Sequence, residues 1–327
     1  MSILALSQAT AAQTAFVFPG QGSQKVGMLA ELAEKFPSIV ATFSEASTAL
    51  GFDLWQIVQS GENLEQTQYT QPALLTASIA LWRVWFAQEG IAPKYLAGHS
   101  LGEYSALVAA EALSLADAVK LVHLRGQLMQ QAVPQGQGAM AAILGLKDEQ
   151  VIDLCQFASL ESQGAVQAAN FNAQGQVVIA GDTEAVKVAI EKAKELSGKA
   201  IVLPVSVPSH CDLMKGASAQ FAQALQQVTL TMPKIPIIHN VNARLATDLD
   251  ELKQALVHQL YQSVQWTKTL AFFEQQEIHY LVECGAGNVL SNLAKRLVFV
   301  EKVLPLDTPS RFDDALQTIF AVEGSHK

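Results

Sequence analysis

The sequence predicts an α/β protein whose main body is interrupted by a smaller inserted unit. Short apolar runs alternate with segments of helical period through most of the chain, which is typical of alternating strands and helices. Between residues 136 and 206 the pattern changes, and afterwards it resumes. The chain has 327 residues, 50% of them hydrophobic, and can bury a body of this size. We therefore expect a large unit of residues 1–135 and 207–327 that carries a small unit of residues 136–206.

The elements before the insertion follow one another in α/β order. Strands are predicted over residues 15–18 and 95–99, and helices over residues 25–50, 71–89, 103–110 and 115–133. The second helix should end at Gly90, because glycine adopts the left-handed conformation that closes many helices. The last helix has Ser114 as a candidate N-cap and Pro134 as its stop.

The inserted segment has an order of its own. Strands are predicted over residues 139–144, 165–171, 176–180 and 200–205, and helices over residues 148–158 and 182–196. The order β-α-β-β-α-β is the ferredoxin-like arrangement, which forms a compact small unit. Helices over residues 212–227 and 249–260 and strands over residues 235–239 and 279–283 then continue the body.

Composition excludes several classes of function. The chain has 21 Lys and Arg against 30 Asp and Glu, and a net charge of −9 opposes binding to nucleic acid. Cys155, Cys211 and Cys284 are widely spaced and form no CxxC pair, so we expect neither disulfides nor a metal site. No signal-peptide pattern precedes Lys25, and no uncharged run is apolar enough to span a membrane. We expect a cytoplasmic protein that binds no membrane.

The strongest chemical motif is Gly98-His99-Ser100-Leu101-Gly102, which matches G-x-S-x-G between a predicted strand and a predicted helix. In that context a tight turn lifts the serine hydroxyl above the sheet edge, and the helix N-terminus favours a developing oxyanion. Ser100 is therefore the candidate nucleophile.

A nucleophilic serine needs a base, and two of the seven histidines are candidates. His210 lies in a Pro-containing loop where the insertion rejoins the body, a location typical of functional groups. His279 would complete the chain order Ser, acid, His with Asp248 or Asp250 as the acid, although it begins a predicted strand. His99, next to the serine, should point elsewhere. The residues alone leave both bases open.

Several motifs in order resemble the malonyl-CoA:acyl carrier protein transacylase family. The resemblance runs from about Ala15 to past Leu293, and its motifs are residues 19–24, 98–102, 125–126, 207–210, 259–261, 264–266 and 283–287. One departure is Ala286, where the family usually has proline between two glycines. The resemblance implies an α/β-hydrolase-like body with a ferredoxin-like subdomain, in agreement with the insertion predicted from periodicity.

The resemblance also implies catalytic roles. It makes Ser100 the nucleophile and His210 its general base, in preference to His279. It implies that the backbone carbonyl of Gln259 holds the His210 ring in place of a carboxylate. It further implies that the backbone N–H groups of Gln21 and Leu101 form the oxyanion hole. From the sequence alone, Gln259 fits equally well as a solvated residue at a helix end.

Two residues on one predicted helix are candidates for binding the acyl group. The position of Arg125 within the helix favours a solvated surface charge, whereas the family uses an arginine there to bind the free carboxylate of malonyl. Met129 is four residues further on and on the same helix face, so it lines the acyl pocket or belongs to the core.

The implied activity is transfer of malonyl from malonyl-CoA to the phosphopantetheine thiol of acyl carrier protein, for fatty acid synthesis. We expect a ping-pong reaction through a malonyl-serine, no bound cofactor, and a monomeric enzyme. The alternatives are a free-standing acyltransferase of a polyketide synthase and, more distantly, an α/β-hydrolase such as a thioesterase. Carrier proteins that serve this family are typically acidic, so a protein with a net charge of −9 should bind its carrier through a local basic patch. Candidates for this patch are Lys295, Arg296 and Lys302, and the alternative is that these residues form an ordinary solvated face.

Overall fold

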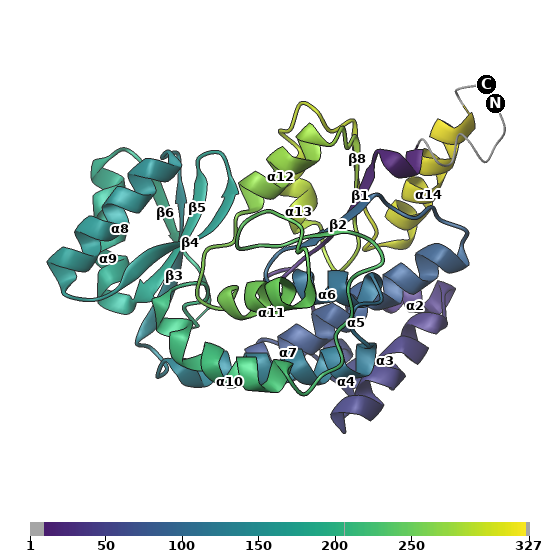
Figure 1. Ribbon diagram of the computed structural model, residues 1–327, viewed down its shortest axis with the longest axis horizontal. Coiled ribbons are helices and arrows are strands. Elements are labelled where there is room, and N and C mark those ends of the chain that lie inside the picture. Colours follow the sequence, from purple (N-terminus) through teal and green to yellow (C-terminus); the bar gives the residue numbers. More distant parts are fainter. Residues whose placement is uncertain (1–9, 206, 325–327) are drawn as a thin grey trace.

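The structure is a computed structural model that describes residues 10–205 and 207–324, and it contains two separate sheets (Figure 1). The strands of the larger sheet are β1 (Thr14–Phe18), β2 (Tyr95–Gly98), β7 (Ile237–Ile238), β8 (Tyr280–Glu283) and β9 (Lys302–Pro305). They are all parallel, in the order β7-β2-β1-β8-β9. The strands of the smaller sheet are β3 (Gly138–Leu144), β4 (Val166–Ala173), β5 (Gln176–Asp182) and β6 (Lys199–Val202). They are antiparallel, in the order β4-β5-β3-β6, so the fold is mixed α/β.

Helices cover both faces of the parallel sheet, as a buried parallel sheet requires. The apolar core on one face includes residues of α3 (Ser38–Leu50), α5 (Thr67–Ala87), α6 (Gly102–Ala109), α7 (Leu115–Ala132), α10 (Lys215–Leu225), α11 (Leu249–His258) and α14 (Pro309–Gly324). The other packs against α12 (Trp266–Gln275) and α13 (Val289–Ala294). Alternate residues of β1 serve the two faces: Phe16 and Phe18 join the first core, Ala15 and Val17 the second.

Two helices of the first part differ from the expected ones, and each difference lies near a proline. The single helix expected through Leu50 is divided at Pro37 into α2 (Ala30–Lys35) and α3, and α4 (Leu54–Ser60) follows. Helix α5 begins at Thr67, four residues earlier than expected, and includes Pro72. Since Pro72 has no N–H, the carbonyl of Gln68 is free of its helical partner, and it lies 2.7 Å from Nδ1 of His123.

The segment after β3 builds the small sheet and its own apolar core. Helices α8 (Asp148–Ser162) and α9 (Thr183–Glu195) lie side by side over one face of this sheet (Figure 1). The core between them contains residues such as Ile143, Val151, Val177 and Ile179, each fully buried. The other face of the sheet packs against Cys211, the residue after His210. The small sheet therefore helps to position the chain segment that holds His210.

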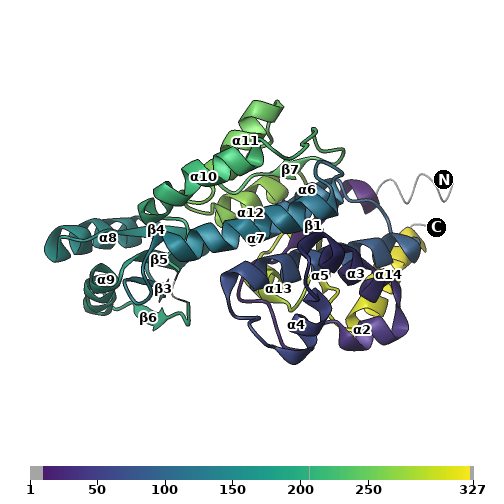
Figure 2. The ribbon, with the colours of Figure 1, turned by 90° about the horizontal axis from the view of Figure 1, so that it is seen from below.

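The small sheet is joined to the body by the chain itself and by hydrogen bonds. Helix α7 runs from the body to the start of β3 (Figure 2). In addition, the N–H of Phe171 on β4 donates to the carbonyl of Val264, and the N–H of Val264 donates to the carbonyl of Ala169, each at 2.9 Å. Within the described part of the chain, no helix is both long and apolar enough to cross a membrane.

Candidate active site

The site lies at the carboxyl edge of the parallel sheet, where the loops after neighbouring strands meet. Phe18 at the end of β1 is in register with Gly98 at the end of β2, and Val17 is in register with Glu283 on β8. The Gly-rich loop 19–24, the serine motif 98–102 and the segment 283–287 therefore begin side by side. A Cβ on Gly20 would lie 2.4 Å from the carbonyl oxygen of His99, so glycine is needed for this close approach.

Ser100 occupies a sharp turn between β2 and α6. Its φ of 51° is in the left-handed region, which is unusual for a residue with a side chain. The glycines on either side permit the turn, because a Cβ on Gly98 would lie 1.8 Å from the carbonyl carbon of Gly102. Asn240, after β7, holds the turn through two side-chain hydrogen bonds. Its Oδ1 accepts from the Ser100 N–H at 2.7 Å, and its Nδ2 donates to the Gly98 carbonyl at 2.6 Å.

His210 lies next to the serine hydroxyl. Its Nε2 is 2.8 Å from Ser100 Oγ, and its Nδ1 is 2.7 Å from the carbonyl oxygen of Gln259. Because a carbonyl only accepts, Nδ1 carries the proton and Nε2 of the neutral ring is left to accept from the serine. The His210 backbone, with φ of 63°, is held by a 3.0 Å bond from its N–H to the Leu260 carbonyl. The Ser100 hydroxyl, the His210 ring and the Gln259 carbonyl thus form a continuous hydrogen-bonded series.

Burial and a neighbouring cation keep His210 neutral. Its side chain is almost fully buried, and its pKa is lowered to about 3, first of all by desolvation. The positive charge of Arg125 and the ring of His99 contribute to this lowering, while the Gln259 carbonyl opposes it by favouring the protonated ring. In the free protein the ring is therefore a ready acceptor at neutral pH.

Arg125 on α7 is buried, with an exposed fraction of 1%, so the solvated surface charge favoured by its helix position is wrong. Its guanidinium donates to Oε1 of Gln71 and to Oε1 of Gln259 at 2.9 Å, and one N–H group is 3.4 Å from Ser100 Oγ. The guanidinium also lies 5.4 Å from the centre of the Tyr104 ring. A cation held this close to the nucleophile suits a substrate that carries an anionic group.

The other predicted residues lie around this centre. Gln259 is fully buried, so the solvated alternative for it is also wrong. Among the described residues, no hydrogen bond uses the backbone N–H of Gln21 or of Leu101, and both remain free to donate. The side chain of Gln21 is exposed and donates to Oγ1 of Thr67 at 3.2 Å. Met129 is buried in the body core, where its sulfur lies 3.6 Å from Nε2 of Gln71.

The late-histidine alternative does not form. Nδ1 of His279 is 3.1 Å from the Phe299 carbonyl, and His279 precedes β8 at the amino edge of the sheet, whereas the serine turn lies at the carboxyl edge. Asp248 is exposed and caps α11 by accepting from the N–H of Glu251. His99 points to Asn172 on β4, with Nε2 and Oδ1 2.7 Å apart. Of the two candidate bases, His210 lies within hydrogen-bonding distance of Ser100 and His279 does not contact it.

Three buried polar residues beside the site have no counterpart in the sequence predictions: Gln71, Glu103 and Asn240. Glu103 is the most unusual, because a fully buried carboxylate is rare unless donors surround it. One sequence signal could have found it, since Glu103 falls on the first turn of the helix after Ser100. Asn240 and Gln71 are remote from Ser100 in sequence and give no such signal.

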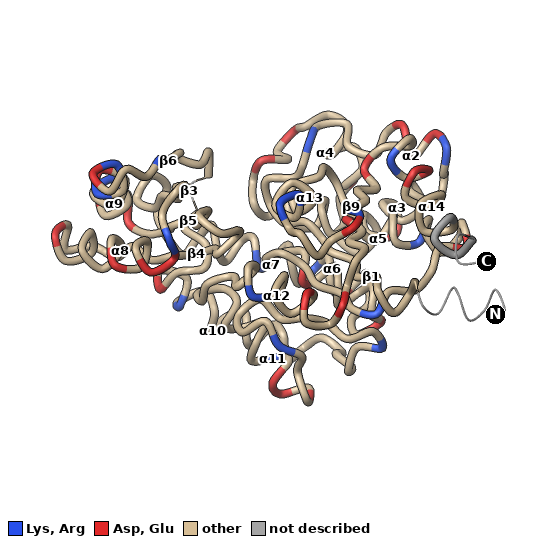
Figure 3. The backbone as a smooth tube through the Cα atoms, turned by 90° about the horizontal axis from the view of Figure 1, so that it is seen from above, with Lys and Arg blue, Asp and Glu red and all other residues tan. Residues whose placement is uncertain are grey.

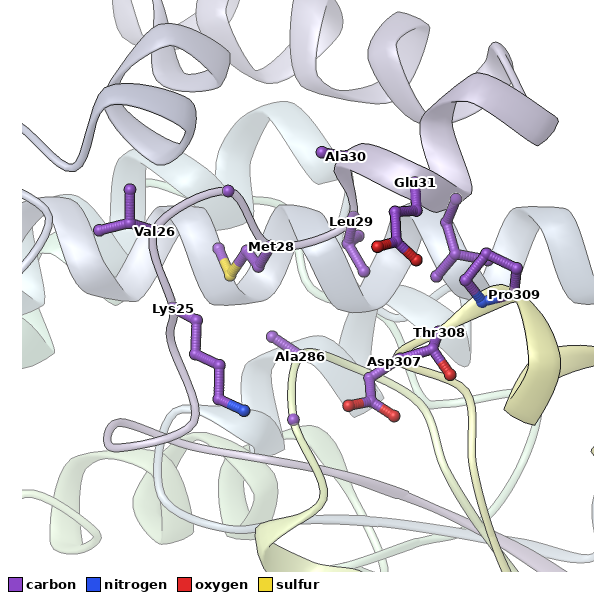
Figure 4. Close-up of a pocket in the computed structure, with 13 residues that line it drawn as sticks. Lys25, Val26, Met28, Leu29, Ala30, Glu31, Ala286, Asp307, Thr308 and Pro309 are labelled. Carbon is purple, nitrogen blue, oxygen red and sulfur yellow. The ribbon is translucent and has the colours of Figure 1, made fainter.

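Two cavities lie apart from this centre. One of about 210 Å³ lies beside the loop after β1, where Lys25, Met28, Glu31 and Asp307 face it (Figure 4). The other, of about 380 Å³, is lined by residues of α13 and β9. Neither includes Ser100, His210 or Arg125. Within residues 10–205 and 207–324, no group of three or more His, Cys, Asp or Glu side chains could hold a metal ion.

Comparison with known proteins gives consistent matches over nearly the whole chain. The family model of the acyl transferase domain matches residues 15–296. The malonyl CoA-acyl carrier protein transacylase of Salmonella typhimurium is 52% identical over 307 residues, which cover 93% of this chain and 99% of that protein.

Solved structures give the same result. The crystal structure of FabD from Acinetobacter baumannii is 65% identical and superposes with a TM-score of 0.94, covering 95% of this chain and 99% of that one. A type II polyketide synthase acyl-carrier protein has been solved in complex with its malonyl-transacylase. That chain is 46% identical, with a TM-score of 0.91 over 94% of this chain and 99% of its own.

Proposed function

Because the chain belongs to the acyl transferase domain family, we propose that it transfers malonyl from malonyl-CoA to the phosphopantetheine thiol of acyl carrier protein. This reaction supplies fatty acid synthesis, and it needs no bound cofactor. The observation that carries the proposal is the constellation at Ser100: a base 2.8 Å from the hydroxyl and a buried guanidinium 3.4 Å from it. A nucleophile and a base alone would suit many acyl groups, whereas the guanidinium favours one that ends in a carboxylate.

In the first half-reaction the Ser100 oxygen attacks the thioester carbonyl of malonyl-CoA, and Nε2 of His210 takes its proton. The N–H groups of Gln21 and Leu101 stabilise the oxyanion of the tetrahedral intermediate. When the carbon–sulfur bond breaks, the imidazolium returns the proton to the sulfur of CoA, and malonyl remains as an ester on Ser100. The Gln259 carbonyl stabilises the imidazolium through Nδ1–H, although less than a carboxylate would.

In the second half-reaction the same groups act in reverse. The carrier thiol gives its proton to His210 and attacks the malonyl ester, after which Ser100 leaves as the alcohol and recovers the proton. This ping-pong sequence needs one site, one base and no third reactant. Arg125 binds the free carboxylate of malonyl in both halves, and Met129 lines the acyl pocket.

Acyl transfer is tested by labelling with malonyl-CoA, followed by mass spectrometry of the peptides. We expect a malonyl mass increase on the peptide with Ser100, and none in Ser100→Ala. His210→Ala should slow labelling strongly, while the control His279→Ala should not, because His279 lies outside the site. Labelling on another residue would contradict the assignment. Rapid release of malonate without a carrier would identify a hydrolase instead.

A second candidate acceptor is the carrier protein of a polyketide synthase. A relative 46% identical to this chain is known in complex with such a carrier. The two acceptors are distinguished by comparing kcat/KM for malonyl transfer to a fatty acid carrier and to a polyketide carrier. We expect the fatty acid carrier to be preferred.

The proposal extends to organisation. Residues 1–135 and 207–327 are an α/β-hydrolase-like subdomain, and residues 136–206 a ferredoxin-like subdomain. The separate cores and the antiparallel order β4-β5-β3-β6 support this division.

The protein works as a monomer, since one chain supplies every site residue. A cytoplasmic location agrees with its three unpaired, buried thiols.

A further inference from the structure

Glu103 is a buried carboxylate beside the active site to which the proposed reaction gives no role. It lies on the first turn of α6, three residues after the nucleophile, with no exposed surface. Its Oε1 is 2.6 Å from Nδ1 of His239, and its Oε2 accepts from the N–H of Asn240 at 3.2 Å and from Nε2 of Gln259 at 2.8 Å. Three donors from two other segments thus surround it, as an ionised carboxylate requires in the interior.

The contact with Gln259 determines which way that amide points. Nε2 of Gln259 faces two groups that only accept, the Glu103 carboxylate and the Ser100 carbonyl, the latter at 2.8 Å. The amide oxygen must therefore point the other way, where it accepts from the guanidinium of Arg125. Reversing the amide would place its NH2 group against a guanidinium that can only donate.

We propose that Glu103 is a positioning residue, whose buried carboxylate orients the Gln259 amide and, through it, the Arg125 guanidinium. Resting on the proposed function, this makes Glu103 a determinant of the preference for a carboxylated acyl group. Burial lowers the pKa of Arg125, and its guanidinium donates to uncharged oxygens of Gln71, Ser100 and Gln259. The negative charge of Glu103 is one of the influences that oppose this lowering.

The readout is selectivity, which a purely structural role would leave unchanged. Acylation of Ser100 is followed with malonyl-CoA and with acetyl-CoA, and the ratio of the two kcat/KM values is compared among variants. Glu103→Ala removes the acceptor of three buried N–H groups, and the Gln259 amide is then held on this side by the Ser100 carbonyl alone. We expect the malonyl-to-acetyl ratio to fall about tenfold or more, the effect of one lost hydrogen bond to a charged group.

Two further substitutions separate orientation from folding. Glu103→Gln keeps an oxygen that accepts from the Gln259 amide, so the ratio should stay within about threefold of the wild-type value. Glu103→Asp keeps the charge, but its shorter side chain moves the carboxylate away from the Gln259 amide, so the ratio should fall. This variant replaces Glu103→Ala in the test if the alanine variant does not fold. The matched control is Glu283→Gln. Glu283 is also fully buried, but it accepts from the N–H groups of Leu290 and Ser291, and its loss should leave the ratio unchanged.

A double-mutant cycle completes the test. If Glu103 acts through Arg125, then Glu103→Ala/Arg125→Ala should have the same ratio as Arg125→Ala alone. A wild-type ratio in both Glu103→Ala and Glu103→Asp would overturn the inference, as would a further fall in the double variant. If the wild-type protein is not acylated by malonyl-CoA at all, the proposed function fails instead, and the two failures are distinct.

Discussion

At the scale of single residues, the site depends on a few buried polar groups held in unusual conformations. Ser100 and His210 both have positive φ angles, and both are held there by backbone hydrogen bonds, to Asn240 and to Leu260. Such strain persists only where the surroundings fix it, and it is typical of catalytic groups. The Ser100–His210 distance of 2.8 Å is therefore present before substrate arrives.

Removal of Arg125 should slow malonyl transfer much more than acetyl transfer. Arg125→Ala removes the guanidinium 3.4 Å from Ser100 Oγ. The activation free energy of malonyl transfer should rise by about 1.5–3 kcal/mol, which lowers kcat/KM roughly 10- to 100-fold. Acetyl transfer should change far less, because acetyl has no carboxylate to pair. Kinetics with both acyl-CoA substrates check this. Equal losses for the two would show that Arg125 does not bind the acyl group.

The pH dependence of acylation should follow the lowered pKa of His210. Burial, Arg125 and His99 bring that pKa to about 3, so the ring stays neutral between about pH 5 and 8, and the protonation of His210 should not change the rate of acylation in this range. In Arg125→Ala one of the lowering charges is lost, so the pKa should rise and the acid limb should move to higher pH. Profiles of kcat/KM with acetyl-CoA measure both. An inflection near pH 6.5 in the wild-type protein would contradict the burial argument.

At the scale of elements, the turn from β2 to α6 is the part most constrained by sterics. A Cβ on Gly98 would lie 1.8 Å from Gly102, and one on Gly102 would lie 2.0 Å from the Phe18 carbonyl oxygen. The close approach of strand, turn and helix thus requires both glycines. It also brings the Gly-rich loop after β1 against the serine turn.

Gly98→Ala should destabilise the protein by about 3 kcal/mol or more, because backbone cannot move aside as a flexible side chain can. The matched control is Gly216→Ala on α10, where an added Cβ meets nothing within 4 Å. Alanine there should be neutral or stabilise by about 0.5–1 kcal/mol, since glycine is the poorer helix former. Denaturant unfolding of both variants gives the free energies. Similar stability for the two would refute the steric explanation.

At the scale of the whole molecule, acidic and basic side chains are interspersed. Figure 3 shows both signs along α9, where Lys187, Lys192 and Lys194 pair with glutamates of the same helix. The candidate docking residues Lys295, Arg296 and Lys302 are exposed, and both lysines line the cavity beside α13. A net charge of −9 nonetheless repels an acidic carrier at long range.

Salt should therefore help the encounter with an acidic carrier. Raising the ionic strength from about 10 mM to about 100 mM shortens the Debye length from ~30 to ~10 Å and screens the repulsion of the two molecules. We expect kcat/KM for the carrier to rise by less than about tenfold, while acylation by malonyl-CoA is measured separately as the control. A steep fall over this range would mean that a basic surface steers the carrier from a distance.

The sequence by itself determined the alternation of strands and helices and the order of the inserted segment, and it predicted Ser100 as the nucleophile. These depend on local patterns, such as the period of apolar residues and the glycines on either side of Ser100. Chain motifs also led to His210, but spacing alone left His279 open, because the distance between residues 110 positions apart depends on the whole path of the chain.

Only the tertiary structure decided the environment of the polar groups. Arg125 and Gln259 fit exposed helix positions in the sequence, yet both are buried, because packing of α7 and α11 against the serine turn closes over them. Glu103, Gln71 and Asn240 gave no prediction at all for the same reason. Burial depends on which elements pack together, and it is burial that turns these side chains into one hydrogen-bonded network around Ser100.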